Sequence, residues 1–508
     1  MRAKIGGDAM RSRDEGDDSE HPIEHDVGHV SPPSVTFQGR RWTAESLTDT
    51  AAAWHSRLAA SVGTASDAVA IVMQAHPETI ALLFAASAMR VPVVLLHPDR
   101  LTWRSAPPFP RAMPVLLAPV AAHFREPLEA AGLSSMVMPA VEAPPRASRP
   151  SFLATPGFVV FTSGSTGVPK PAFRSTRGVL QVVRTIARTF ALPAGVRVAG
   201  CLPLATSFGL TQNILLPAVL GGDVTMLDRF DYRSLLNLFA AEEFDYWPGT
   251  ALMADLLVRA PLDGWTGRTP RICNLSSGYL HESIYRRFLA RFGVPLRQSY
   301  GRTECSFITS ESAPIDEIRP ETVGRPSPGV ELRCGDAPNA PVPAGAPGRI
   351  WIRCPWHSEG YGYPPHLERT ARFDGWHPTE DVGILTEEGR LVILGRIDDC
   401  FKTAGGYLVS PALVAGALRS EDPVLDAAVV PVRGRNGTGI GIVAVVREGV
   451  AGADVRALAR RTLPAWSRPA VVAICSTIPT LPSGKHDRTA CIALLESRMV
   501  RGFEEAPA

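Results

Sequence analysis

Hydrophobic residues recur with two different periods between residues 35 and 395. Residues 43–62 carry apolar side chains at helical spacing, which predicts an amphipathic helix buried through Leu47, Ala51, Trp54 and Leu58. Residues 78–90 predict a second helix. Short apolar runs typical of buried strands occupy residues 68–73, 91–96 and 114–117. Strands separated by helices of this length favour parallel βαβ units, so we expect a large α/β unit here.

The pattern changes at residues 395–406, which follow a predicted strand at 390–394. Beyond them the apolar runs predict strands at residues 427–432, 439–446 and 470–475 and a helix at 454–463. We therefore predict an α/β fold in two parts: a large multi-layer α/β N-terminal domain over residues 35–397 and a small, mobile α+β C-terminal domain over residues 398–508. Residues 1–34 are charged and poor in large apolar side chains, which predicts a disordered tail.

Composition narrows the class of protein. The chain has 508 residues, of which 52 are Lys or Arg and 50 are Asp or Glu, giving a net charge of +2. This near balance argues against nucleic acid as the main partner, because phosphate neutralisation needs an excess of basic side chains. The eight cysteines are widely spaced and form no C-x-x-C motif, which favours a reducing compartment over a zinc ribbon. No apolar run predicts a membrane span or a secretory signal, so we expect a cytoplasmic protein.

A loop rich in Gly, Ser and Thr follows the apolar run at residues 157–160 and reads F-T-S-G-S-T-G-V-P-K over residues 161–170. Glycines let such a loop bring backbone N–H groups close to an anion, while hydroxyls and a lysine add further donors. The sequence is not a Walker A loop, because G-x-x-x-x-G-K-[ST] is absent. Taken alone, the run has the composition of a flexible loop as much as that of a polyphosphate site.

Three further segments carry candidate chemistry. Residues 299–304 (S-Y-G-R-T-E) combine an aromatic ring, a hydroxyl and a carboxylate, which suit base stacking, phosphate binding and Mg²⁺ ligation. Residues 376–383 contain Asp381, a natural partner for ribose hydroxyls, and lead into G-R-I-D-D at 395–399. Lys485 closes the segment P-T-L-P-S-G-K near the C-terminus, although a lone lysine after glycine is usually a solvated loop charge.

Together, in this order, the four motifs resemble those of the acyl-adenylate-forming superfamily, which includes acyl-CoA synthetases, nonribosomal peptide adenylation domains and luciferases. The resemblance runs from about residue 40 to the end of the chain. It implies a two-step ligase that uses ATP, Mg²⁺ and a thiol. A carboxylate first attacks the α-phosphate of ATP to give an acyl-adenylate and pyrophosphate, and a thiol then displaces AMP.

The resemblance also implies residue roles. The phosphate loop and Lys170 would hold the pyrophosphate end, Tyr300 would pack on adenine, and Thr303 would touch the α-phosphate. Glu304 would bind Mg²⁺. Asp381 and Arg396 would hold the ribose, and Lys485 would contact the reacting carboxylate and the α-phosphate. Asp398 would be the hinge about which the small domain rotates, so that the loop at residues 402–406 faces the site in the second step. The full nucleotide set is Thr162, Ser163, Gly164, Ser165, Thr166, Gly167, Lys170, Gly278, Tyr300, Asp381 and Arg396.

The acid pocket is less well defined by the sequence. Its candidate residues are Phe208, Gly209, Trp247, Gly249, Ser277 and Tyr279. Aromatic rings with glycines suit an aryl acid or a short to medium acyl chain, but each could equally pack in the core. Amino-acid-activating relatives carry an Asp at the position of Gly209, so an α-amino acid is not expected, because its ammonium would lack a partner.

Departures from the family pattern keep several outcomes open. Thr379-Glu380-Asp381 replaces the usual T-G-D and places a like charge beside Asp381, while Ala205 and Thr206 replace an aromatic residue and a His gate and suggest a wide entrance. The thiol is most simply CoA. The alternatives are the phosphopantetheine of a separate acyl carrier protein, an adenylate used for amide or ester formation, and a catalytically silent nucleotide-binding relative.

Overall fold

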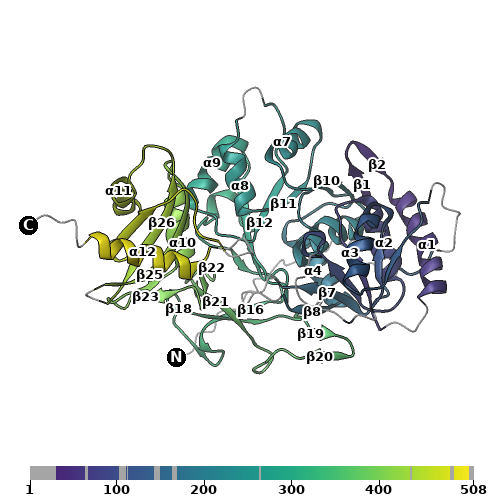
Figure 1. Ribbon diagram of the computed structural model, residues 1–508. Coiled ribbons are helices and arrows are strands. Elements are labelled where there is room, and N and C mark those ends of the chain that lie inside the picture. The colour runs from purple at the N-terminus through teal and green to yellow at the C-terminus, as the bar shows by residue number, and fades with distance from the viewer. Residues whose placement is uncertain are drawn as a thin grey trace, which may run out of the picture.

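The computed structural model describes residues 30–62, 67–101, 110, 113–141, 149–162, 169–261, 265–434, 437–480 and 486–502. Figure 1 shows a large domain, coloured purple to green, and a smaller yellow-green domain at the C-terminal end. The predicted α/β fold, with a large N-terminal and a small C-terminal domain, is confirmed. Residues 1–29 of the predicted tail lie outside the described residues.

The first sheet of the large domain has eight strands in the order β20-β19-β8-β7-β4-β3-β5-β6. Its strands are β3 (Val69–Val72), β4 (Val93–Leu96), β5 (Val115–Leu117), β6 (Ser135–Val137), β7 (Gly157–Phe161), β8 (Pro171–Ser175), β19 (Gly360–Tyr363) and β20 (His366–Glu368). β3 pairs in parallel with β4 and β5, as the βαβ pattern predicts. The predicted helices are α1 (Ala44–Ser61), capped by the Thr43 hydroxyl, and α2 (Pro77–Ser87).

The second sheet has nine strands in the order β15-β14-β13-β12-β11-β9-β10-β1-β2. Its strands are β1 (Ser34–Phe37), β2 (Arg40–Trp42), β9 (Arg197–Gly200), β10 (Asp223–Met226), β11 (Tyr246–Thr250), β12 (Ile272–Ser276), β13 (Leu296–Tyr300), β14 (Thr309–Ser310) and β15 (Arg325–Pro326). Helix α4 (Thr176–Thr189) joins the two sheets, because its Val183 and Ile186 share one core with Phe158 of β7 and Val198 of β9.

Further helices cover the outer face of the second sheet or connect strands. They are α3 (Arg125–Ala130), α5 (Ser207–Gly209), a π-helical turn η4 (Leu210–Leu215), α6 (Leu216–Val219), α7 (Tyr232–Ala241), α8 (Ala251–Arg259) and α9 (Glu282–Phe292). Short 3₁₀ turns occupy Pro98–Arg100, Pro119–Phe124, Ile315–Glu317 and Ala465–Ser467. A core of Leu, Phe and Trp side chains, including Phe239 of α7 and Phe288 of α9, packs α7, α8 and α9 on the sheet.

A five-stranded antiparallel sheet, ordered β17-β16-β18-β21-β22, completes the large domain. Its strands are β16 (Glu331–Ala337), β17 (Ala340–Pro341), β18 (Pro347–Arg353), β21 (His377–Leu385) and β22 (Leu391–Arg396). Asp381 lies directly opposite Arg396 in the pairing of β21 with β22. This register brings two of the sequence-predicted nucleotide residues together.

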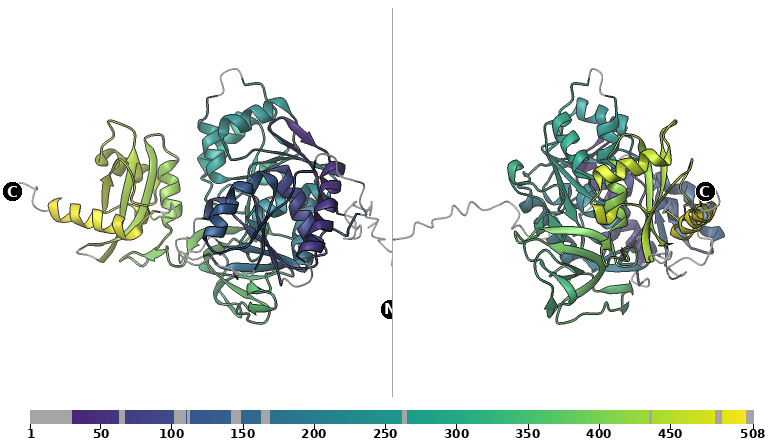
Figure 2. Two further views of the ribbon diagram at one scale, coloured as in Figure 1. Left: turned by 45° about the vertical axis from the view of Figure 1, so that its right-hand side comes forward. Right: turned by 90° about the vertical axis from the view of Figure 1, so that its left-hand side faces the viewer.

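The small domain has its own core. It comprises β23 (Phe401–Lys402), β24 (Leu408–Val409), α10 (Pro411–Arg419), β25 (Val424–Gly434), β26 (Gly437–Val446), α11 (Gly452–Thr462), β27 (Val471–Ile474) and α12 (Arg488–Gly502). Figure 2 shows it standing to one side of the large domain. Its two buried clusters draw only on residues between 409 and 495. This separation supports the boundary at 397/398, which remains a prediction.

Two global features follow from the described residues. No helix among them is both long enough and apolar enough to cross a membrane. All eight cysteines are described, and no two of them form a disulfide.

Candidate active site

A cavity of about 810 Å³ lies where the two large sheets, the antiparallel sheet and the start of α10 meet. Its wall brings together segments that are far apart in the sequence. The sequence-predicted residues that line it are Thr162, Lys170, Phe208, Ser277, Gly278, Tyr279, Tyr300, Thr303, Glu304, Asp381 and Arg396. The small domain contributes Ala412 at the first turn of α10.

Several expected residues lie outside the described residues, namely Ser163, Gly164, Ser165, Thr166, Gly167 and Lys485. The described ends of the phosphate loop are held together, because Thr162 N–H donates to the Lys170 carbonyl at 2.9 Å and Lys170 N–H donates to Thr162 Oγ1 at 3.1 Å. Lys170 also places its ammonium 5.5 Å from the centre of the Tyr361 ring.

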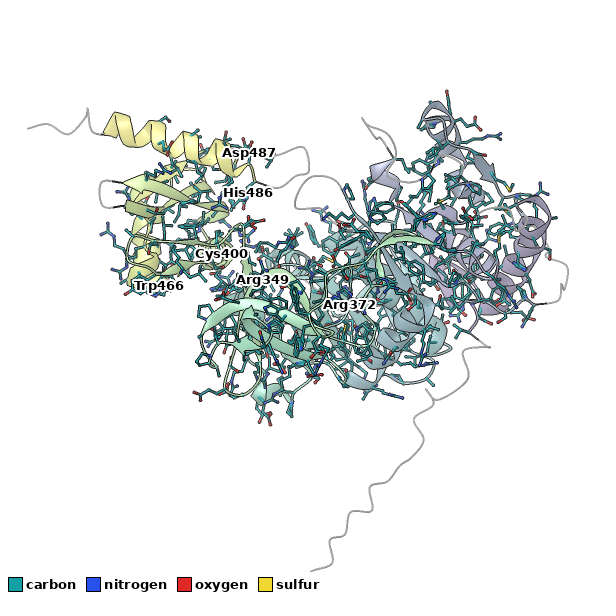
Figure 3. All side chains as sticks on the ribbon, turned by 90° about the horizontal axis from the view of Figure 1, so that it is seen from below. Arg349, Arg372, Cys400, Trp466, His486 and Asp487 are labelled. Atoms are coloured by element: carbon teal, nitrogen blue, oxygen red, sulfur yellow. The ribbon has the colours of Figure 1, made fainter. Side chains whose placement is uncertain are left out.

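The described residues beside Lys485 belong to the small domain. His486 and Asp487 lie at the start of α12 (Figure 3). His486 forms an isolated antiparallel bridge with Thr480 and an ion pair with Asp426, Nε2 to Oδ2, at 2.9 Å. These contacts anchor both sides of the lysine segment to the small domain.

Asp381 is buried and held by three side chains. Its Oδ2 accepts the Tyr300 hydroxyl at 2.5 Å and Arg302 Nη1 at 2.7 Å, and its Oδ1 lies 3.7 Å from Arg396 Nη1. Glu380, the unexpected like charge beside Asp381, forms its own ion pair with Arg396. The arginine between them therefore offsets the repulsion that the Thr-Glu-Asp sequence predicts.

Glu304 is the second carboxylate of the cavity wall. Its Oε1 accepts the Tyr361 hydroxyl at 2.5 Å, and its Oε2 lies 3.5 Å from Arg302 Nε. Burial alone would raise the pKa of Glu304, but the Arg302 guanidinium and the Tyr361 hydroxyl outweigh it and hold the pKa below its ordinary value. Glu304 is therefore an ionised carboxylate facing the cavity.

An ionised carboxylate fits the chemistry expected for Mg²⁺. This ion is usually held by one or two carboxylates together with substrate phosphates and waters. Within the part of the chain that the structure describes, no group of three or more His, Cys, Asp or Glu side chains could hold a metal by itself. Glu304 thus suits a metal shared with a polyphosphate better than a metal held by protein alone.

Arg174 is a fully buried cation that sequence reasoning missed. From β8 its Nη1 donates to the Thr303 carbonyl at 2.9 Å, to Ser306 Oγ at 2.7 Å and to Ser207 Oγ at 3.3 Å. Ser207, Thr303 and Ser306 all line the cavity. Arg174 therefore ties the Y-G-R-T-E loop to the acid-pocket segment, and an arginine in the otherwise apolar strand P-A-F-R-S was the available signal.

Arg302 was also missed, although it stands inside the Y-G-R-T-E motif. It contacts both carboxylates, Asp381 and Glu304, and these acidic groups raise its pKa against the effect of burial. A charged residue flanked by motif residues on both sides was the signal that could have identified it.

The turn after β12 shapes the wall next to the predicted acid pocket. Ser277 has φ of 61° and Gly278 has φ of 114°, both in the left-handed region that disfavours most side chains. The turn places both residues and Tyr279 on the cavity wall, as expected. Phe208 also lines the cavity.

Trp247 and Gly249 do not line the cavity, which corrects the expectation. Successive side chains of a strand face opposite ways, and these two point from β11 into the helical core. Trp247 is fully buried, stacks on Phe288 and donates its indole N–H to Cys201 Sγ at 3.4 Å. Gly249 lies against the Trp247 ring, where an added Cβ would meet a ring atom at 2.6 Å.

Gly209 also lies outside the cavity wall. A Cβ added there would meet the Pro203 carbonyl oxygen at 2.0 Å, so the backbone leaves no room for any side chain. Ala205 and Thr206, which suggested a wide entrance, both line the cavity. Thr206 also caps α5, because its Oγ1 accepts Gly209 N–H at 2.9 Å and donates to the Pro203 carbonyl at 2.8 Å. The sequence of this turn is therefore dictated by packing.

Asp398, the predicted hinge, follows β22 and precedes the small domain. Its carbonyl oxygen accepts Arg488 Nη1 at 2.5 Å, which links it to α12. The structure holds one arrangement of the two domains, so the hinge role stays a prediction.

Fold and site together define a two-domain α/β enzyme whose cavity presents an aromatic ring, two carboxylates and a lysine suited to a nucleotide and its phosphates. The sequence profile described as AMP-binding enzyme matches residues 111–362. The chain is 30% identical over 387 residues to the sulfoacetate–CoA ligase of Cupriavidus necator, covering 72% of this chain and 75% of that protein. It therefore belongs to the AMP-binding enzyme family, whose members form acyl-adenylates.

Two other relatives agree with this assignment. The benzoate–CoA ligase of Thauera aromatica is 29% identical over 277 residues, which cover 54% of this chain and 52% of that protein. The amide bond synthetase McbA from Marinactinospora thermotolerans superposes with a TM-score of 0.76 at 25% identity, covering 92% of this chain and 97% of that one.

Proposed function

We propose that this AMP-binding enzyme is an ATP-dependent acid–thiol ligase that activates a non-amino carboxylic acid and transfers it to CoA. The observation that carries the proposal is the cavity itself, which gathers Lys170, Tyr300, Thr303, Glu304 and Asp381 from three separate motifs. The CoA-ligase relatives support the reaction class.

In this proposal the nucleotide is held by the polar groups described above. Asp381 accepts hydrogen bonds from the ribose hydroxyls, and Tyr300, Arg302 and Arg396 hold its carboxylate in place. The Tyr300 ring packs on adenine, with Gly278 beside it. Glu304 holds Mg²⁺, which neutralises phosphate charge when bound.

Adenylation joins the acid to AMP. A carboxylate oxygen of the acid forms a bond to the α-phosphorus while the bond to the pyrophosphate oxygen breaks, and pyrophosphate leaves with the electron pair. Donors preorganised around the developing charge lower the barrier. We assign this role to the Thr303 hydroxyl, to Lys170 with the phosphate loop, and to Lys485, which would bridge the carboxylate and the α-phosphate.

Thioester formation follows. The thiol sulfur bonds to the acyl carbon, the acyl–phosphate oxygen bond breaks and AMP leaves, while the thiol proton is released. We propose that the small domain turns about Asp398 between the steps and brings residues 402–406 to the site. CoA is the proposed thiol; a separate acyl carrier protein is the alternative acceptor.

The acid is proposed to be an aryl or short to medium acyl acid. Phe208, Ser277 and Tyr279 line the cavity, which supports a site of mixed apolar and polar character. The closed packing at Gly209 supports the exclusion of α-amino acids, since no anionic side chain fits there to pair with an ammonium. We also propose a cytoplasmic location, which the widely spaced cysteines support.

A second candidate is amide formation from the same adenylate. The structural similarity to an amide bond synthetase over nearly the whole chain supports this second candidate. It differs only in the second nucleophile, so the two candidates separate when an amine or CoA is offered to the preformed adenylate.

The test is acid-dependent ATP–pyrophosphate exchange across aryl, short, medium and long acids, followed by addition of CoA. The proposal expects exchange with one class of acid and acyl-CoA after CoA is added. If the enzyme catalyses ATP–pyrophosphate exchange but forms a product only when an amine is added, the assignment changes to amide formation. Absence of exchange with every acid, in protein that binds ATP, would overturn the ligase assignment.

A further inference from the structure

A buried chain of hydrogen bonds runs along the cavity floor. Ser299 Oγ of β13 donates to Asn274 Oδ1 at 2.9 Å, and Asn274 Nδ2 of β12 donates to the Tyr246 hydroxyl oxygen at 2.7 Å. The Tyr246 hydroxyl of β11 donates to Gln212 Oε1 at 2.5 Å. Asn274 Nδ2 also donates to Gln212 Oε1, at 3.2 Å. Side chains of two neighbouring strands, β11 and β12, thus donate to one amide oxygen, and Ser299 of β13 extends the chain through Asn274.

In the structure the Gln212 amide turns Oε1 toward Tyr246 and Asn274. With Oε1 engaged by two donors, the amide nitrogen is left on the other side of the group. Among the described residues, no hydrogen bond to Gln212 Nε2 is found, yet the side chain is only 3% exposed and lines the cavity. The amide nitrogen is therefore open to the cavity. An acid with a suitably placed oxygen pairs with this donor, whereas an acid without one displaces water and leaves the donor unpaired, at a cost of about 1–3 kcal/mol.

Gln212 belongs to the acid side of the cavity. It lies on η4, four residues after Phe208. Its partner Asn274 lies on β12, which leads into the turn at Ser277, and its partner Tyr246 lies on the neighbouring strand β11. The groups proposed for the nucleotide, such as Asp381 and Glu304, have their own separate partners in Arg302, Tyr300 and Tyr361. The unpaired donor therefore faces the acid.

We propose that the acid carries a second oxygen, a hydrogen-bond acceptor, that pairs with the Gln212 amide N–H. This inference rests on the proposed function and narrows its substrate class from any aryl or acyl acid to acids with a hydroxyl, carbonyl, carboxylate or sulfonate oxygen besides the reacting carboxylate. Tyr246 and Asn274 are positioning residues, because they hold the amide oxygen away from the cavity and turn the nitrogen toward it.

A neutral amide suits this task for a physical reason. Sites built around a hydrogen-bond donor reject analogues that lack the acceptor far more strongly than apolar pockets reject an extra methylene. Trp247, the large aromatic residue expected in this pocket, faces the opposite side of β11 and leaves the polar face of Tyr246 toward Gln212. Because successive side chains of β11 face opposite ways, Trp247 points away from the pocket and Tyr246 points toward Gln212.

The experiment measures kcat/KM for ATP–pyrophosphate exchange with matched acid pairs that differ in one oxygen, for example a hydroxy or keto acid against its hydrocarbon analogue, in aryl and acyl series. We expect the wild-type enzyme to prefer the oxygenated acid of at least one pair by about tenfold or more. Gln212→Leu should reduce that preference to near unity by raising KM for the oxygenated acid, with KM for ATP unchanged.

Two further variants keep the test decisive. Tyr246→Phe retains Gln212 but removes a donor that orients it, so the preference should fall part of the way. Gln181→Leu, a glutamine on α4 outside the cavity, should leave it intact. If Gln212→Leu does not fold, Gln212→Met and Tyr246→Phe give the same readout.

The outcomes separate the two claims. Equal exchange with both members of every pair, or a preference unchanged in Gln212→Leu, would overturn this inference and leave the ligase assignment standing. No exchange with any acid would overturn the ligase assignment first, and the inference with it.

Discussion

At the scale of single residues, the site is organised by Arg302. It contacts Asp381 at 2.7 Å and Glu304 at 3.5 Å, while all three side chains are largely buried. A buried charge is tolerated only when it is paired. Removing one partner leaves the remaining charges buried without compensation, so their full desolvation penalty is felt. One arginine therefore contacts both the proposed ribose ligand and the proposed metal ligand, and it lowers the pKa of the latter, Glu304.

Replacing Arg302 by Met should weaken both functions at once. Loss of a buried charge partner costs about 3–5 kcal/mol, so kcat/KM for ATP should fall on the order of a hundredfold or more. The pKa of Glu304 should rise, because its main lowering cause is gone, and the acid limb of the pH–rate profile should move to higher pH. Arg286→Met, which removes an exposed pair with Glu282, is the control. An unshifted acid limb would refute the pairing.

The stacked pair of His357 and His377 makes a prediction about stability. Their ring centres lie 3.2 Å apart, and burial lowers the pKa of His357 to about 4 and that of His377 to about 3. Both lie below the ordinary value near 6.5, so the unfolded chain takes up protons first as the pH falls. The stability from the neutral pair is complete above pH 6.5 and is lost as the pH falls toward 4.

Thermal unfolding measured between pH 7 and 4 tests this. The free energy of unfolding should fall by up to about 1.4 kcal/mol per pH unit for each histidine. His377→Phe should unfold with a shallower pH dependence than the wild type over the same range. Identical slopes in the two proteins would show that the pair does not titrate as inferred.

At the scale of elements, periodicity in the sequence predicted most strands and helices well. The helix expected at residues 43–62 appears as α1, and the strands expected at 427–432 and 439–446 appear within β25 and β26. The sequence did not predict which face of a strand lines the cavity. β11 is buried on both faces, so its hydrophobic pattern does not show which face lines the cavity. Trp247 was therefore assigned to the pocket although it lies in the core.

The turn at Gly209 gives a test at this scale. Gly209→Ala should lower the melting temperature and acid-dependent exchange together, because its Cβ would meet the Pro203 carbonyl oxygen at 2.0 Å and force the turn open. Gly209→Asp should do the same and should not introduce amino-acid activation. Gly452→Ala, where the nearest atoms lie 3.8 Å away, should be harmless. A stable, active Gly209→Asp enzyme would contradict this packing.

At the scale of the whole molecule, the small domain closes one side of the cavity. Tyr279 of the large domain packs directly against Gly416 of α10, and Arg259 Nη2 donates to the Arg419 carbonyl at 2.8 Å. The family resemblance carried by the four motifs implied the candidate active-site residues and the hinge, and these roles stay predictions. Motif spacing could not predict this interface, because a glycine under a tyrosine ring has no local signature.

The hinge prediction belongs to this scale. Asp398→Pro fixes φ and should hinder rotation of the small domain, so thioester formation should slow more than adenylation. Asp398→Ala, which keeps backbone freedom, is the matched control. The two half-reactions are followed by pyrophosphate exchange and by CoA-dependent release of AMP. A larger effect on exchange than on thioester formation would refute the hinge.

The central claim is that this chain joins an acid to CoA through an acyl-adenylate. The most direct test incubates the enzyme with ATP, Mg²⁺, CoA and the acid that gives the strongest exchange, and identifies all products by mass spectrometry. The account predicts AMP, pyrophosphate and acyl-CoA in equal amounts, with no ADP. ADP and phosphate in place of AMP, or AMP without any acyl-CoA, would contradict it.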